Sequence, residues 1–115
     1  MDRQIFRCER ALRVLLEYDA TMSARQVVVF LEIARATDGI EAAIIERQLG
    51  GNRAAVTQAL GHLRSTYGTG TKRGLHKLIE VRDPPGDRRK TVAFLSPEGR
   101  KVVAEMQRVM EGMAA

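Results

Sequence analysis

The segment from Leu78 to Val103 constrains the fold of this 115-residue chain more than any other part. Two short runs within it, Leu78–Arg82 and Thr91–Leu95, are rich in the β-branched and aromatic residues that favour strands. The residues between the runs include two prolines and a glycine, which remove donors from a strand ladder and favour a turn. The pattern therefore predicts a β-hairpin with a charged tip.

A helix is predicted directly after the hairpin. Ser96 is a good N-cap residue, and Pro97 stands at the first helical position, where a missing N–H costs nothing. The helix should run from Pro97 to about Met113 and carries a wide apolar stripe made of Val102, Val103, Met106, Val109, Met110 and Met113. Such a stripe predicts packing on the N-terminal helix or burial against a second subunit.

Two helices are predicted before the basic part of the chain. The first spans about Arg3–Tyr18, and its expected inner face consists of Ile5, Cys8, Leu12, Leu15 and Leu16. The second begins at Ser23, which can form a capping box with Gln26. It should end at Thr37–Gly39, where Gly39 is free to take a positive φ.

Two further helices joined by a glycine turn are typical of a helix-turn-helix unit. They cover about Glu41–Leu49 and Arg53–Ser65, and Gly50–Gly51 separates them. Asn52 can cap the second helix, whose expected buried side consists of Val56, Ala59, Leu60 and Leu63. The alternative to a helix-turn-helix is a plain pair of antiparallel helices, and the hairpin that follows argues against it.

The net charge of +5 is unevenly distributed along the chain. Residues 47–90 hold ten Lys and Arg against three Asp and Glu, whereas the remainder holds nine against eleven. Fifteen of the nineteen basic residues are arginine, which suits bidentate contacts with phosphate and guanine. This concentration over one predicted motif favours a polyanion-binding face over a merely solvated surface.

Composition excludes several other classes of protein. With 115 residues the chain should form a single domain, 1–115, and no apolar run is long enough to span a bilayer. The single cysteine, Cys8, excludes an internal disulfide framework, and the two histidines have no companion ligands at metal spacing. The glycine-rich connector 68–74 lacks the spacing of a phosphate-binding loop. We therefore expect no metal, no cofactor and no enzymatic activity, in a cytoplasmic or nuclear protein.

The hairpin tip and the start of the last helix resemble a known family. Asp87-Arg88-Arg89, followed after one strand by Leu95-Ser96-Pro97-Glu98-Gly99-Arg100, is similar to the wing of MarR-type winged-helix transcription regulators. The resemblance covers roughly Ser23–Met106. It implies a mainly α fold with a small β-hairpin wing, a winged helix-turn-helix whose terminal helices (1–20 and 97–113) serve dimerisation. The short terminal helices would reduce or remove the effector pocket that the family often has. Whether a small-molecule effector binds is therefore left open.

Candidate DNA-binding residues follow from this reading. On the recognition helix Gln58 can pair with adenine, Arg53 with guanine or phosphate, and Thr57 with a thymine methyl group or phosphate. By the resemblance Asp87 orients Arg89, which enters the minor groove. The full predicted set is Asn52, Arg53, Ala54, Thr57, Gln58, Arg64, Lys72, Arg73, Asp87, Arg88, Arg89 and Lys90.

The sequence thus predicts a sequence-specific regulator that binds double-stranded DNA, a homodimeric repressor on a pseudo-palindromic operator with half-sites about 10 bp apart. Two departures from the usual helix-turn-helix pattern are Glu46, where a small residue is general, and Gly51, where an apolar one is common. The main alternative is a winged helix that binds a protein and no specific DNA. A third reading is a sensor with its ligand beside Cys8 and Tyr18, although a buried, inert cysteine is favoured.

Overall fold

A computed structural model describes residues 2–64, 77–83 and 90–112 of the chain. In chain order its elements are α1 (Arg3–Tyr18), α2 (Ala24–Arg35), β1 (Ile40–Glu41), α3 (Ala42–Gln48), α4 (Arg53–Leu63), β2 (Ile79–Arg82), β3 (Val92–Leu95) and α5 (Pro97–Gly112). All five predicted helices and the predicted hairpin strands are present. The strand β1 was not expected from the sequence, since a run of two residues carries no recognisable strand pattern.

The helix ends use the caps that the sequence predicts. At α2 the Ser23 hydroxyl accepts from the Gln26 amide at 3.1 Å, and the Gln26 side chain accepts from the Ser23 amide at 2.9 Å. At α4 the Asn52 side chain accepts from the Ala55 amide at 3.0 Å. Gly50 and Gly51 have φ values of 79° and 84°, a conformation that side-chain-bearing residues rarely adopt. These two glycines let the chain reverse between α3 and α4.

The three strands form an antiparallel sheet in the order β1-β3-β2. The strands β2 and β3 are the hairpin, with Val81 opposite Ala93, and β1 adds Ile40 opposite the same alanine. Beyond β1, the Ala42 amide donates to the Thr91 carbonyl at 2.8 Å. Because α3 starts where β1 ends, the hairpin is joined by main-chain hydrogen bonds to the helix-turn-helix unit.

The joint between the hairpin and α5 is tightly packed. The Ser96 hydroxyl accepts from the Gly99 amide at 2.9 Å, as expected of a cap, and donates to the Lys77 carbonyl at 2.5 Å. A side chain at Gly99 would place its Cβ 2.0 Å from the Leu78 carbonyl oxygen. Glycine is therefore required at this position by the close approach of β2 to α5.

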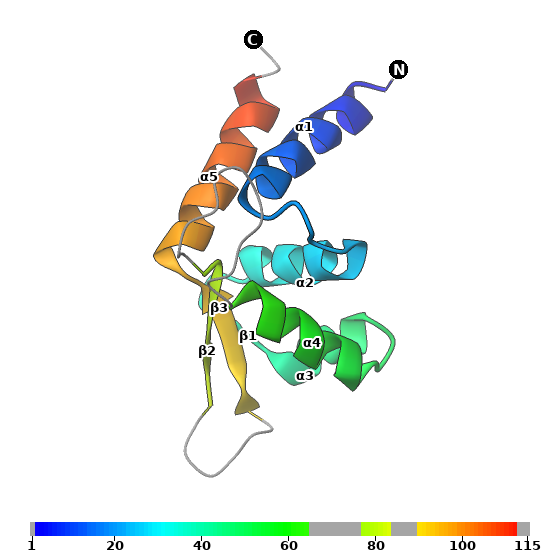
Figure 1. Ribbon diagram of the computed structural model, residues 1–115, viewed down its shortest axis with the longest axis vertical. Coiled ribbons are helices and arrows are strands. Elements are labelled where there is room, and N and C mark those ends of the chain that lie inside the picture. The colour runs from blue at the N-terminus through cyan, green and yellow to red at the C-terminus, as the bar shows by residue number, and fades with distance from the viewer. Residues whose placement is uncertain (1, 65–76, 84–89, 113–115) are drawn as a thin grey trace.

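Figure 1 shows two parts stacked along the long axis of the molecule. The terminal helices α1 and α5 pack against each other at one end, and α2, α3, α4 and the sheet occupy the other. One core runs through both parts, with Leu15 and Val102 from the helical pair and Phe30, Ile45 and Ile79 from the rest, all fully buried. This is the winged helix-turn-helix fold, mainly α with a small antiparallel sheet.

The predicted inner face of α1 is partly wrong. The residues that α1 buries are Ala11, Val14 and Leu15, whereas Ile5 is 61% exposed, Leu16 is 40% exposed and Cys8 is exposed. The reason is that apolar residues cover more than one side of this helix, so periodicity alone does not decide which side meets α5. The apolar stripe of α5 does pack within the chain at Val102 and Met106, while Met110 remains 38% exposed.

Candidate nucleic-acid interface

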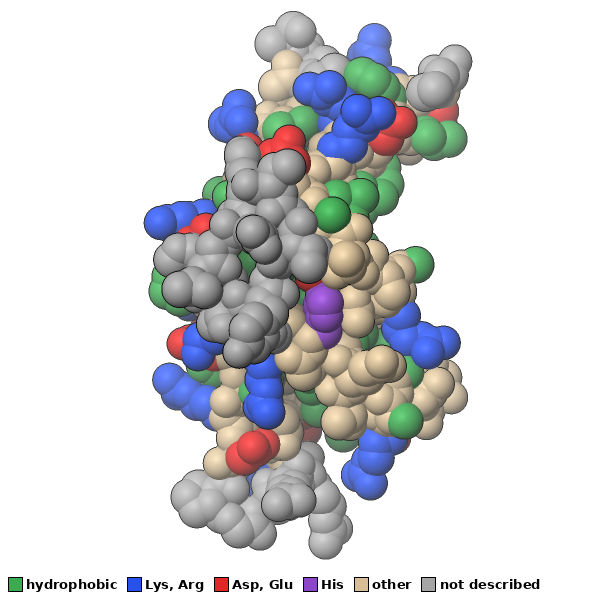
Figure 2. All heavy atoms as spheres, viewed as in Figure 1, with side chains coloured by type: hydrophobic (Ala, Val, Ile, Leu, Met, Phe, Trp, Pro, Cys, Tyr) green, Lys and Arg blue, Asp and Glu red, His purple; other side chains and the backbone are tan. Residues whose placement is uncertain are grey.

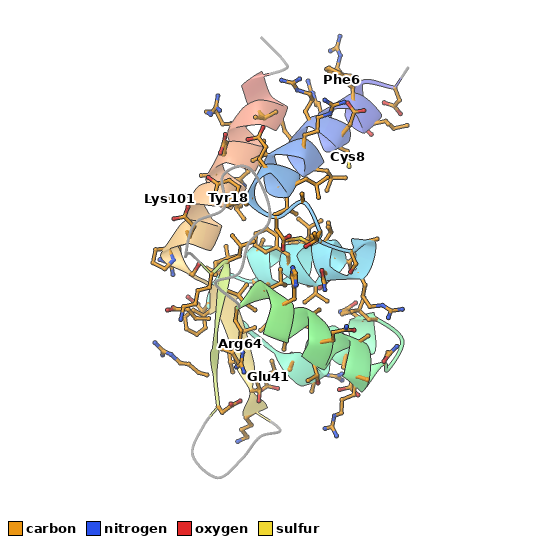
Figure 3. All side chains as sticks on the ribbon, viewed as in Figure 1. Phe6, Cys8, Tyr18, Glu41, Arg64 and Lys101 are labelled. Atoms are coloured by element: carbon orange, nitrogen blue, oxygen red, sulfur yellow. The ribbon has the colours of Figure 1, made fainter. Side chains whose placement is uncertain are left out.

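Helix α4 exposes the side that carries its predicted contact residues. Ala55, Val56, Ala59, Leu60 and Leu63 are buried against the rest of the fold. On the opposite side the exposed residues are Asn52, Arg53, Ala54, Thr57 and Gln58. These side chains occupy the first two turns of the helix and can therefore reach a ligand together. Arg64 is also exposed and caps the end of α4 nearest the sheet (Figure 3).

The far end of α4 is tied to the corner between α1 and α2. The buried carboxylate of Asp19 contacts the imidazole of His62, and it accepts from the amide and the hydroxyl of Thr21 at 3.0 and 2.8 Å. Burial raises the pKa of Asp19, but the hydrogen bonds from Thr21 and the contact with His62 outweigh it, so its pKa lies below the usual value. The local sequence gives no sign of this link, because its partners lie 43 positions apart.

The base of the wing presents an arginine held on an aromatic ring. The guanidinium of Arg82 lies over the ring of Phe94, 4.9 Å from its centre, which restricts the orientation of this exposed side chain. At the end of the strands the Thr91 hydroxyl donates to the Asp83 carboxylate at 2.5 Å, and Lys90 is exposed beside them. The predicted contacts Asp87, Arg88 and Arg89, and Lys72 and Arg73 of the connector, lie outside the described residues.

Positive charge remains in excess on this part of the fold. Among the described residues from 47 onward to 90, six are basic (Arg47, Arg53, Arg64, Lys77, Arg82, Lys90) and two are acidic (Glu80, Asp83). Figure 2 shows Lys and Arg side chains around the helix-turn-helix and the sheet, and also a group at the opposite end over α1. The basic surface is therefore wider than the sequence segment that predicted it.

A polar hollow of about 240 Å³ opens beside the sheet. The linker residues 36–38 after α2 form one wall, strand residues Arg82 and Phe94 form another, and Arg100 of α5 closes the hollow. The linker lies close to β3 at Gly39, where φ is 99° and an added Cβ would lie 2.9 Å from the Val92 side chain. The hollow brings two arginines together from elements that are distant in the sequence.

The remaining predicted features concern metal-ligand groups, membrane-spanning helices and the single cysteine, Cys8. In the described ranges no group of three His, Cys, Asp or Glu side chains is placed to hold a metal ion. No described helix is both long enough and apolar enough to cross a membrane. The expectation of a buried cysteine is wrong, since Cys8 is exposed on α1 (Figure 3). Its helical spacing places it on an apolar side, but that side faces solvent.

Known structures share this fold at low sequence identity. The protein RV1404 from Mycobacterium tuberculosis superposes with a TM-score of 0.62 at 18% identity, over 90% of this chain and 63% of that one. This chain thus spans less than two thirds of the length of RV1404. BpsR from Bordetella bronchiseptica, a protein whose DNA binding is regulated by 6-hydroxynicotinic acid, superposes with a TM-score of 0.57 at 23% identity, over 96% of this chain and 77% of that one. No family model and no curated protein sequence matches the chain.

Proposed function

We propose that this chain is a sequence-specific, double-stranded DNA-binding transcription regulator of the MarR type. The observation that carries the proposal is the exposed first half of α4, where Arg53, Thr57 and Gln58 face solvent on a helix whose other side is buried. Arginine and glutamine are the residues that read guanine and adenine by paired hydrogen bonds in the major groove. The DNA binding of BpsR, which has the same fold, adds support for this kind of function.

In this proposal α4 and the hairpin bind in different grooves of the DNA. The helix α4 enters the major groove, where its N-terminal residues meet base edges. The hairpin reaches the adjacent minor groove through Arg89, with Asp87 orienting the guanidinium. Exposed cations at the base of the wing, Arg82 and Lys90, face the phosphate backbone, which binds without regard to sequence.

We further propose that two copies associate through their terminal helices, so that residues 1–20 and 97–113 serve dimerisation within a single domain, 1–115. An apolar row consisting of Ile5, Cys8, Leu12 and Leu16 runs along α1 on the side that α5 leaves uncovered, with Met110 exposed on α5. A second copy would remove this surface from water. A symmetric dimer also presents two α4 helices to successive major grooves about 10 bp apart. Occupying such a pseudo-palindrome at a promoter would repress transcription.

Selection from a random DNA duplex library tests the proposal. The full chain should enrich a pseudo-palindrome, and Gln58→Ala should lower affinity for the selected duplex by about 1–3 kcal/mol. Arg13→Ala is the control, because this exposed arginine lies on α1, away from the exposed side of α4. If no sequence is enriched and binding is weak at physiological salt, a protein-binding winged helix becomes the better account.

A further inference from the structure

An ion pair crosses the turn of the helix-turn-helix unit. The Nε atom of Arg53, the first residue of α4, lies 3.8 Å from a carboxylate oxygen of Glu46 on α3. The two side chains differ in exposure, since Arg53 is 79% exposed and Glu46 is 29% exposed. Arg53 therefore extends into solvent from a carboxylate that is itself largely covered.

The backbone of the turn fixes the position of Glu46. Its carbonyl oxygen accepts from the amides of Leu49 at 3.2 Å and Gly51 at 2.8 Å, so the residue belongs to the reversal between α3 and α4. The usual helix-turn-helix has a small residue at this place. In this chain the larger side chain is accommodated, and its charged end points toward the helix that faces the proposed ligand.

The geometry of the guanidinium gives this pair a specific consequence. An arginine reads guanine with a pair of N–H donors directed at the O6 and N7 atoms. The Nε edge is the side that faces Glu46, which leaves the two terminal nitrogens of Arg53 free for such a contact. The negative charge of Glu46 favours the orientation of Arg53 in which Nε faces α3. A side chain with a preferred orientation loses less conformational entropy on binding.

We propose that Glu46 is a positioning residue that orients Arg53 to read one guanine in each half-site. The inference rests on the proposed function, and it assigns a role to a residue that the sequence marked only as a departure from the usual pattern. It makes an unusual prediction. A carboxylate near DNA repels phosphates, so removing its charge should strengthen general DNA binding while it weakens the preference for guanine at one position.

The experiment measures the affinity of the full chain for its selected duplex. It also measures the affinity for three variants of that duplex, in which each of the other base pairs replaces the G·C pair read by Arg53. That position is the one at which Arg53→Ala abolishes discrimination. The unmodified chain should prefer guanine about tenfold or more. Glu46→Gln should reduce the preference to about threefold or less, while affinity for a scrambled duplex stays equal or rises. Glu46→Ala should have the same effect, which guards against a residual contact from the glutamine amide.

Glu41→Gln is the matched control, because it removes the same charge from an exposed residue whose side chain makes no capping hydrogen bond. It should leave the guanine preference unchanged. In the double variant of Glu46→Gln with Arg53→Ala, discrimination should equal that of Arg53→Ala alone. The inference is overturned if the unmodified chain selects a site and Glu46→Gln retains the full guanine preference. If the unmodified chain selects no DNA at all, the proposed function fails and this inference with it.

Discussion

Asp19 is the single residue with the clearest predicted effect on stability. Its pKa lies below the ordinary value of 3.8, so its carboxylate stabilises the fold above that pH and ceases to do so as the pH falls through the lower folded-state value. Asp19→Asn should lower the free energy of unfolding at pH 7 by about 1–3 kcal/mol, because Thr21 and His62 lose the charge of the buried carboxylate that they contact. Urea unfolding from pH 7 down to pH 3 measures this, and the deficit should shrink below pH 4.

The control for this prediction is Asp38→Asn, which alters an exposed carboxylate. A deficit of the same size in both variants, or one that persists unchanged in acid, would show that the link between Asp19 and His62 does not stabilise the fold.

Arg89 at the wing is predicted by the resemblance to read the minor groove. Arg89→Ala should weaken binding to the preferred duplex by about 1–3 kcal/mol and reduce its preference for A·T pairs at the flanks. Arg88→Ala should instead weaken binding to all duplexes alike, as expected for a phosphate contact. Anisotropy titrations with flank-substituted duplexes compare the two. Equal behaviour of both variants would remove the minor-groove role from Arg89.

The joint between the hairpin and α5 is a backbone contact that one methyl group should disrupt. Gly99→Ala places a Cβ within 2.0 Å of the Leu78 carbonyl oxygen, and neither main chain can yield without moving β2 or α5. We expect a loss of about 1–3 kcal/mol in unfolding free energy. Gly61→Ala is the comparison, since open space surrounds that helical glycine, and it should add up to about 1 kcal/mol. Chemical denaturation in which Gly99→Ala is as stable as the unmodified chain would contradict this packing.

The sequence was sufficient to place the elements whose signals are local. Ser23 with Gln26, Asn52 after two glycines, and Ser96 before a proline each mark a helix start by hydrogen bonds within four residues. It was not sufficient for features that depend on tertiary packing. The side of α1 that meets α5 could not be chosen because the apolar part of this helix is wider than the part that becomes buried. The strand β1 exists only through its pairing with β3.

The same distinction applies to the candidate site. Exposure of Arg53, Thr57 and Gln58 follows from helical spacing opposite a buried face, so the sequence predicted it. The contacts of Arg82 with Phe94 and of Glu46 with Arg53 form between separate elements, so no local sequence pattern predicts them.

Considered as a whole, the molecule leaves an apolar side of α1 uncovered, and this gives a test of the proposed dimer. Ile5→Glu should convert the dimer to a monomer in sedimentation at micromolar concentration and reduce DNA affinity with it, because Ile5 is 61% exposed and its substitution leaves the core intact. A charge at Met106 would be a poor test, since that residue is buried within the chain and its substitution would disturb folding. An unmodified chain that sediments as a monomer would end the dimer model.

We propose that this winged helix binds DNA by sequence, and one titration series measures this property. The affinities of the selected duplex and of a scrambled duplex are measured by anisotropy between about 50 and 200 mM salt. We expect the selected duplex to bind about a thousandfold tighter or more, and both affinities to fall steeply as salt weakens the phosphate contacts. Equal affinities for the two duplexes, with a slope near zero for log affinity against log salt concentration, would contradict sequence-specific DNA binding.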